Sequence, residues 1–211
     1  MNLFIIGASG GTGKQLVQQA LGHGHQVTAL VRNPKKFKII HENLKVVNGD
    51  VLDSASFKDS MAGHDAVVSA LGHKKFFIKT SILSRGTSTI ITAMKANNIK
   101  RFLCITSLGI NDSRFKLGLY YTLFVIPVIL FFYFKDKEKQ EQLIENSQLD
   151  WTIVRPVQLT NGKKRTNYKH GVTGIGHYIF TKLISRASVA DFMLSQLSDS
   201  NYLYKKVGVS N

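Results

Sequence analysis

Near the start of the chain runs the stretch Leu3-Phe4-Ile5-Ile6-Gly7-Ala8-Ser9-Gly10-Gly11-Thr12-Gly13-Lys14, in which an apolar run leads directly into a glycine-rich turn. The apolar residues predict a buried β-strand, and the residues after the turn predict a helix over 12–22. Glycines at 7, 10 and 13 allow the backbone to turn sharply, to approach a pyrophosphate closely and to pack the helix on its strand. The unpaired N–H groups and the positive dipole end of this helix would face the phosphates.

A second strand-like run, residues 26–31, follows at once and completes a strand–helix–strand unit. This context favours a dinucleotide-binding turn over an ordinary turn between a strand and a helix. Apolar strand patterns then alternate with helical patterns along the chain, which predicts a parallel sheet covered on both faces. The expected strands are 2–6, 26–31, 44–48, 65–70, 101–106, 151–155 and 204–209, and the expected helices are 12–22, 54–61, 82–97, 136–147 and 188–198.

Length and composition fit one globular domain. The 211 residues are 44% hydrophobic and 19% charged, which excludes a disordered chain. No repeat, low-complexity tract or linker interrupts them, so we expect a single domain over 1–211. The single cysteine, Cys104, lies in an apolar run and is expected to be a buried thiol. Because the first strand occupies the N-terminus, no signal peptide is expected, and the predicted compartment is the cytoplasm.

The chain carries a net charge of +15, from 28 basic and 13 acidic residues. Basic residues cluster at 32–38, at Lys74 and Lys75, at 135–139 and at 163–169. These clusters fall in predicted loops and helix starts and not along one recognition helix, so direct binding to nucleic acid is not expected. We attribute most of the charge to the attraction of phosphorylated cofactors and to a lysine-rich composition.

Residues 117–134 form an uncharged and strongly apolar segment. Its length approaches that of a transmembrane helix, but Pro127 would kink it, tyrosines and a threonine interrupt it, and further sheet elements follow it. We therefore expect an apolar lid or wall over the substrate pocket. A peripheral contact of this segment with a membrane or a partner stays open, and a monomer and a homodimer are both compatible with the sequence.

Arg32 follows the second strand, where an NAD-selective fold would place an acidic residue on the ribose 2′-hydroxyl. A guanidinium can bind a 2′-phosphate bidentately, so the predicted cofactor is NADPH in preference to NADH. The third strand leads to Asp50, whose carboxylate can accept a hydrogen bond from the adenine amino group, and Val51 could flank the ring. The next two predicted strands end near 69–72 and 106–107, at the same edge of the sheet, where open α/β folds bind ligands.

Several runs of residues together resemble the atypical short-chain dehydrogenase/reductase superfamily. They are residues 7–13, 30–33, 49–53, 93–95 and 151–156, and the resemblance continues through 185–192 near the end of the chain. It is greatest to the NAD(P)H-binding branch that includes biliverdin-IXβ/flavin reductase and the NmrA-like proteins. It implies a doubly wound Rossmann fold with a mostly parallel, seven-stranded sheet and helices on both faces. It also implies hydride delivery from NADPH to a planar acceptor such as a flavin.

The resemblance also implies cofactor-binding residues, carried over by position. The pyrophosphate would be held by Gly7, Ser9, Gly10, Gly11, Thr12 and Gly13, and the 2′-phosphate by Arg32. Adenine would contact Asp50 and Val51, and the inner ribose Ala70, Leu71 and Gly72. Thr106 and Ser107 would lie beside the nicotinamide, and Arg155, Pro156 and Val157 would close over it.

Three residues are candidates for catalysis: Ser107, Tyr133 and Lys137. The spacing Tyr133-x-x-x-Lys137 matches the pair with which carbonyl-reducing short-chain dehydrogenases donate a proton. Here Tyr133 ends an aromatic run 26 residues beyond Ser107, a longer gap than usual, so a packing role for Tyr133 stays open. Flavin-reductase-like relatives need no side-chain acid, because the flavin accepts hydride at nitrogen and water can supply the proton. The histidines show no metal-ligand spacing, so no metal site is expected.

Three functions stay open on these observations. The first is an NADPH-dependent oxidoreductase that transfers hydride to a planar acceptor such as a flavin or a quinone. The second is a non-catalytic, NADP(H)-binding redox sensor of the NmrA-like type that regulates a partner. The third is a carbonyl reductase or epimerase that uses Tyr133 and Lys137.

Overall fold

In the computed structural model, the apolar runs of the sequence form the strands of a central sheet. The structure describes residues 1–73 and 75–211. Lys74, one of the two residues of the basic cluster at 74 and 75, lies outside the described residues. Seven of the described strands are parallel and stand in the order β3-β2-β1-β4-β5-β6-β10. Their bounds are β1 (Asn2–Ile6), β2 (Gln26–Val31), β3 (Leu44–Asn48), β4 (Ala66–Ser69), β5 (Arg101–Ile105), β6 (Asp150–Pro156) and β10 (Lys205–Ser210). The doubly wound, mostly parallel Rossmann fold that we predicted is confirmed.

The sheet has one strand more than the seven predicted. β8 (Lys169–Gly171) pairs antiparallel with β10 at the edge, in a register that sets Gly208 opposite Gly171. The residues of β8 are Lys, His and Gly, so no apolar alternation marks them, and the pairing comes from the neighbouring strand. β7 (Gln158–Thr160) and β9 (Leu183–Ser185) form a separate parallel pair.

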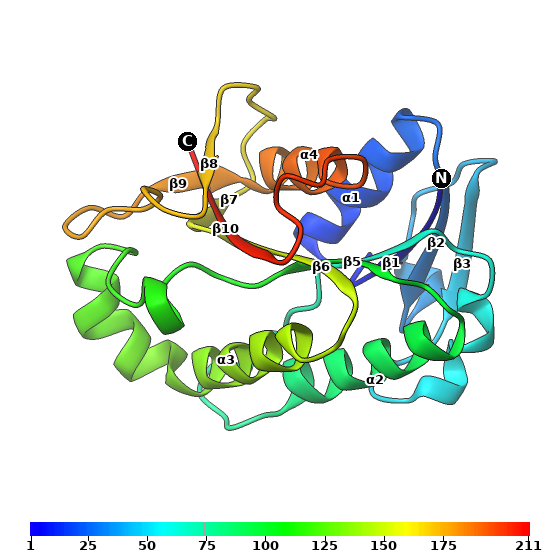
Figure 1. Cartoon of the computed structure of the whole chain (residues 1–211), viewed down its shortest axis with the longest axis horizontal. Helices are drawn as coiled ribbons and strands as arrows, with labels where there is room; N and C mark the ends of the chain where they lie inside the picture. The colour runs from blue at the N-terminus through cyan, green and yellow to red at the C-terminus, as the bar shows by residue number, and fades with distance from the viewer. Residues whose placement is uncertain (74) are drawn as a thin grey trace.

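Helices cover both faces of the sheet, as Figure 1 shows. α1 (Gly11–Gly22) packs with α4 (Arg186–Ser195) on one face, and α2 (Ile82–Ala96) packs with α3 (Phe131–Glu145) on the other. The helix predicted at 136–147 therefore begins five residues earlier than expected.

The helix predicted over 54–61 is wrong. The structure has two short 3₁₀ turns there, Ser54–Ser56 and Asp59–Met61. The Ser56 hydroxyl donates to the Asp53 carbonyl (2.6 Å) and accepts from the Asp50 N–H (3.0 Å), while an Asp53 carboxylate oxygen accepts from the Ala55 N–H (3.1 Å). Such local bonds from short polar side chains compete with helical backbone bonds, and here they hold a compact loop.

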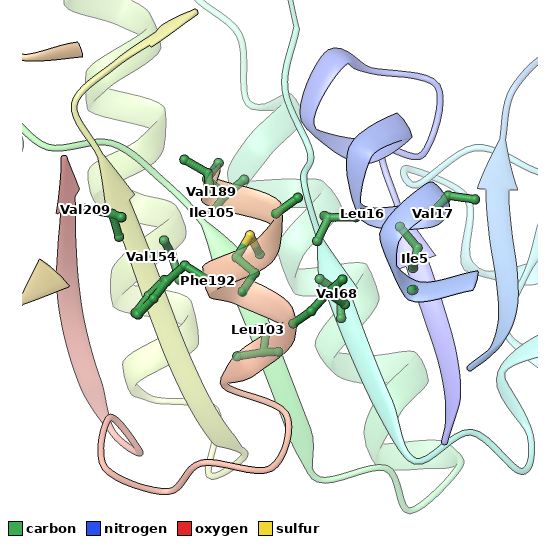
Figure 2. Close-up of a cluster of buried hydrophobic side chains, with 14 of the residues drawn as sticks. Ile5, Leu16, Val17, Val68, Leu103, Ile105, Val154, Val189, Phe192 and Val209 are labelled. Carbon is green, nitrogen blue, oxygen red and sulfur yellow. The ribbon is translucent and has the colours of Figure 1, made fainter. Parts of the chain in front are cut away.

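Each central strand contributes side chains from its two faces to two separate apolar cores. In β1, Leu3 and Ile5 face the α1/α4 layer, while Phe4 and Ile6 face the α2/α3 layer, as the period-2 geometry of a strand requires. Figure 2 shows the first core, with strand residues Ile5, Val68, Leu103, Ile105, Val154 and Val209 and helix residues Leu16, Val17, Val189 and Phe192. Burial on both faces explains why the strands read as continuous apolar runs.

Cys104 lies in the second core with no exposed surface, and burial raises the pKa of its thiol to about 12. Because the reactive species is the thiolate, we expect the folded protein to resist a thiol-specific disulfide reagent at neutral pH. The same protein unfolded in urea should release one equivalent of the reagent's chromophore. Rapid stoichiometric labelling of the folded protein would contradict this burial.

The apolar segment 117–134 is helical over most of its length. Tyr121–Leu130 forms wide, π-type turns that continue directly into α3. Pro127 lies inside these turns, and because it has no N–H and its ring crowds the preceding turn, it disrupts regular α-helical bonding. Across the described part of the chain, no helix combines the length and apolar character that a membrane span needs.

Candidate functional site

The strand order reverses between β1 and β4, which is the position where open α/β sheets bind ligands. Gly7 follows β1 with a φ of +75°, and a Cβ at this position would overlap the Ala70 carbonyl oxygen and lie 2.7 Å from the Ala70 carbonyl carbon. Only glycine combines this backbone conformation with so close an approach. The turn can therefore pass across the end of β4 and leave a crevice above both strands.

The N-terminus of α1 opens into the same crevice. Gly10 precedes the helix, no side chain caps it, and its first turn holds no acidic residue. The Gly10 N–H donates to the Gly7 carbonyl (2.9 Å). The first N–H groups of the helix, which include those of Gly11 and Thr12, have no hydrogen-bond acceptor within the helix. Free N–H groups at the positive end of a helix dipole suit a phosphate.

A cavity of about 880 Å³ runs along this edge of the sheet. It gathers most of the residues that the sequence nominates, from six strand ends and two helices. They are Gly7, Ser9, Gly10, Gly11, Thr12, Arg32, Asp50, Val51, Ala70, Leu71, Gly72, Thr106, Ser107, Tyr133, Lys137, Pro156 and Val157.

Two nominated residues lie behind the cavity wall. Gly13 packs α1 against the turn, since a Cβ there would overlap the Gly7 carbonyl oxygen. Arg155 is 2% exposed, and its guanidinium is engaged by Glu141 and Asp112, so the segment reaches the cavity through Pro156 and Val157 instead.

Arg186 also lines the cavity, although it is not among the residues that the sequence nominates. Ser185 caps α4 by accepting the Ser188 N–H (3.0 Å), which makes Arg186 the first residue of that helix. A Cβ at Gly11 would lie 2.7 Å from the Arg186 Cδ, so the arginine stem rests on the glycine turn. Its guanidinium donates to the Asn161 side-chain oxygen (2.7 Å). In the sequence, residues 185–186 stand out only as part of the family resemblance. No pattern in the neighbouring residues indicates that Arg186 contacts the glycine turn.

At the other end of the cavity, Arg32 and Asp50 occupy the ends of β2 and β3. Arg32 is exposed, and within the described ranges no hydrogen bond or ion pair holds its guanidinium. Asp50 accepts the Leu52 N–H at one carboxylate oxygen (3.0 Å), which fixes the loop that carries Val51. A positive and a negative side chain thus line the cavity beyond the ends of two neighbouring strands.

A buried ion pair supports the floor of the cavity. Glu141, fully buried on α3, accepts from the Arg155 Nε (2.9 Å) and Nη2 (2.6 Å), from the Thr106 hydroxyl (2.7 Å) and from the Asn111 amide (2.9 Å). Burial alone would lower the pKa of Arg155, but the bonds and charge of Glu141 outweigh it and raise the pKa, so the guanidinium stays charged. This network holds Thr106, at the end of β5, in one position.

Lys137 and Tyr133 face the cavity from successive turns of α3. Lys137 is 4% exposed, and its ammonium donates to the Thr106 carbonyl (3.0 Å) and lies 5.2 Å from the centre of the Tyr133 ring. The Tyr133 ring packs edge-on against His73 and Phe76. The lysine therefore meets the ring face of the tyrosine, and the described residues include no hydrogen bond between its ammonium and the tyrosine hydroxyl. Two of its three N–H groups remain for a ligand.

Part of the cavity wall is apolar. Leu117, Tyr121 and Leu130 of the apolar segment line it, with Phe134 and Leu159 beside them. Among the residues that the structure describes, no group of three or more His, Cys, Asp or Glu side chains could hold a metal ion. The cavity thus pairs an anion-binding half with an apolar half that contains one buried cation.

Comparisons with known proteins agree with this geometry. A family model described as NAD(P)H-binding matches residues 7–200. An uncharacterised chloroplast protein of Arabidopsis thaliana is 26% identical over 220 residues, which cover 98% of this chain and 75% of that protein. The photosystem II assembly factor Ycf39 of Cyanophora paradoxa is 26% identical over 158 residues, which cover 74% of this chain and 44% of that protein. The chain thus spans less than half the length of the second relative.

Among solved structures, ChuY of Escherichia coli O157:H7, described as an anaerobillin reductase, superposes with a TM-score of 0.80. The two sequences are 20% identical, and the alignment covers 100% of this chain and 97% of that one. At this identity the likeness establishes a shared fold.

Proposed function

The chain belongs to the NAD(P)H-binding family, and we propose that it is an NADPH-dependent reductase that transfers hydride to a planar acceptor such as a flavin or a quinone. The observation that carries the proposal is one continuous cavity that runs from Arg32, past the N-terminus of α1, to Thr106 and Lys137. Its volume of about 880 Å³ is at the upper end of the range for ligand pockets and suits a dinucleotide beside a second molecule. The description of ChuY as a reductase supports the same class of reaction.

The half of the cavity around the glycine turn fits a pyrophosphate because it offers N–H donors and a cation, and the first turn of α1 holds no acidic residue. The free N–H groups of Gly11 and Thr12 would hold the pyrophosphate, and Arg186, resting on Gly11, would add a cation from the far end of the chain. Arg32 would bind the 2′-phosphate, since a guanidinium matches the geometry of a phosphate. Bound NADPH would supply the hydride from its nicotinamide.

The acceptor half would be shaped by the apolar wall and by Lys137. Leu117, Tyr121 and Leu130 would exclude water and favour a flat, apolar molecule. The buried ammonium of Lys137, held by the Thr106 carbonyl, would stabilise negative charge that develops on the acceptor. Ser107, whose hydroxyl donates to the Leu108 carbonyl (2.8 Å), stands beside Thr106 as a further polar contact. Tyr133 would serve mainly to pack Lys137 in place.

Substitution Arg32→Gln should weaken NADPH binding by roughly tenfold to a hundredfold, because a charge-assisted bond to a phosphate contributes about 1.5–3 kcal/mol. NADH lacks this phosphate, so its dissociation constant should change little. Calorimetric titration with each coenzyme measures both. Lys35→Gln is the matched control, because Lys35 is an exposed neighbour that does not line the cavity. Equal weakening toward NADPH and NADH would contradict the assigned role of Arg32.

Turnover tests the proposal directly. Purified protein with NADPH and excess FMN or a soluble quinone should show loss of the absorbance of the reduced nicotinamide, faster than heat-denatured protein does. Binding of NADPH without turnover on any flavin or quinone would reject the reductase and favour the NmrA-like sensor. Reduction of carbonyl compounds that the variant Tyr133→Phe abolishes would favour the third function instead.

We propose the cytoplasm as the compartment, since a lone buried thiol suits a reducing environment. The Arabidopsis relative is described as chloroplastic, so a plastid is the other candidate. Fractionation of the source cells with an antibody to this chain separates the two.

A further inference from the structure

The outer face of the apolar segment is exposed. Large apolar side chains there present most of their surface to solvent, with exposed fractions of 61% for Phe124, 72% for Val128 and 68% for Phe180. We define the apolar patch as the exposed side chains of two segments, 119–132 and 178–183. Its members are Leu119, Tyr120, Leu123, Phe124, Val128, Ile129, Phe131, Phe132, Tyr178, Ile179, Phe180 and Leu183.

Hydrogen bonds join the two segments into one surface. The Leu119 N–H donates to the Ile179 carbonyl (3.1 Å), and the Thr181 hydroxyl donates to the Leu117 carbonyl (3.0 Å). Both segments project at the same end of the molecule, the left of Figure 1, away from β3 at the opposite edge of the sheet. The two segments therefore lie side by side, and together they expose twelve large apolar side chains, more than the single scattered ones of an ordinary surface.

The charges around the patch are predominantly positive. Residues 117–134 contain no charged side chain, and the exposed cations Arg114, Lys135 and Lys182 border the two segments. Glu138 offsets part of this charge, because it pairs with Lys135 (2.9 Å) and Arg114 (3.6 Å). The chain as a whole carries +15.

We propose that the apolar patch docks this protein on the surface of an anionic lipid bilayer. Phenylalanine, tyrosine and leucine side chains enter the boundary between headgroups and acyl chains, and flanking lysines and arginines bind anionic headgroups. A second copy of the chain is the less favourable occupant, because a symmetric contact would bring two positive borders together between molecules of net charge +15. A protein–protein interface typically carries about ten direct hydrogen bonds. Among the members of the patch in 119–132, Tyr120 is the one whose side chain can form a hydrogen bond.

The inner face of the same segment belongs to the cavity, through Leu117, Tyr121 and Leu130. Docking would therefore set one wall of the cavity against lipid. Membrane docking does not depend on hydride transfer, so its test and the test of the reductase can fail separately.

Sedimentation with vesicles tests the docking. The full chain should sediment with vesicles of phosphatidylcholine and phosphatidylglycerol, and much less with phosphatidylcholine alone. The double variant Phe124→Gln/Val128→Gln should bind the anionic vesicles at least roughly tenfold more weakly, because it removes two apolar side chains from the lipid. Neither side chain lines the cavity, and circular dichroism would verify the fold. Ile40→Gln is the matched control, since Ile40 is 95% exposed but lies before β3, far from the patch.

Fluorescence gives an independent readout. In the variant Phe124→Trp, emission should shift to shorter wavelength when anionic vesicles are added, while the native Trp151, which is 7% exposed, contributes a constant background. The proposal is overturned if the full chain stays in the supernatant with both vesicles, or if the double variant binds as the native chain does. It is also overturned if analytical ultracentrifugation shows a dimer that the double variant dissociates, because a second copy then covers the patch.

Discussion

Substitution Gly13→Ala is expected to lower the free energy of unfolding by about 3 kcal/mol or more, because an added methyl group finds only backbone around it. A Cβ at Gly13 would overlap the Gly7 carbonyl oxygen and lie 2.7 Å from the Gly7 carbonyl carbon and 2.8 Å from the Ala8 Cα. No rotamer change relieves contacts with backbone, so α1 must move away from the turn. Urea unfolding measures the loss of stability, and calorimetry should show that NADPH binding is lost with it.

Gly22→Ala provides the control at the other end of α1. Apart from its chain neighbours and the backbone of its own helix, no atom lies within 4 Å of a Cβ at Gly22, and alanine has the higher helix propensity. This variant should be as stable as the native chain, or more stable by up to about 1 kcal/mol. A Gly13→Ala variant of native stability would show that the turn can shift without cost, against the packing described above.

The second large effect is expected at the buried ion pair. Substitution Glu141→Gln should lower the free energy of unfolding by about 3–5 kcal/mol, because it leaves the Arg155 guanidinium buried without its main counter-charge. The Asp112 carboxylate, bonded to Arg155 Nη1 (2.8 Å), is largely exposed and can offset only part of the loss. Urea unfolding again provides the measurement.

The double variant Glu141→Leu/Arg155→Met separates the charge from the packing. Replacement of both partners by apolar side chains removes the unpaired charge, so this variant should be more stable than Glu141→Gln. It should still be less stable than the native chain, because Thr106 and Asn111 lose their shared acceptor. If the double variant proves less stable than the single one, packing around Glu141 and not its charge dominates.

The strands and the position of the site could be predicted from the sequence for a local reason. The apolar runs of the central strands are buried on both faces of the parallel sheet, so their burial hardly depends on which strands become their neighbours. The residues that follow the strands must then meet at one edge. This is why Gly7, Arg32, Asp50 and Thr106, far apart in the sequence, could be assigned to one cavity, which the structure contains. The glycine turn could be predicted from its own residues, because its shape depends on local backbone conformation.

The remaining features depend on partners that no local pattern reveals. Arg155 lies near the end of β6, close to the cavity, but its charge is taken by Glu141, which reaches it from α3. Arg186 lies at the glycine turn only because α4 packs on α1. β8 is a strand because β10 offers an unpaired edge.

The sequence of residues 117–134 was enough to show that the segment is apolar and uncharged, because both properties follow directly from the residue types. Its division into an inner face that lines the cavity and an outer face exposed to solvent arose from packing against α3 and residues 177–181. Hydropathy is a property of each side chain, whereas the direction in which a side chain points depends on contacts with distant parts of the chain.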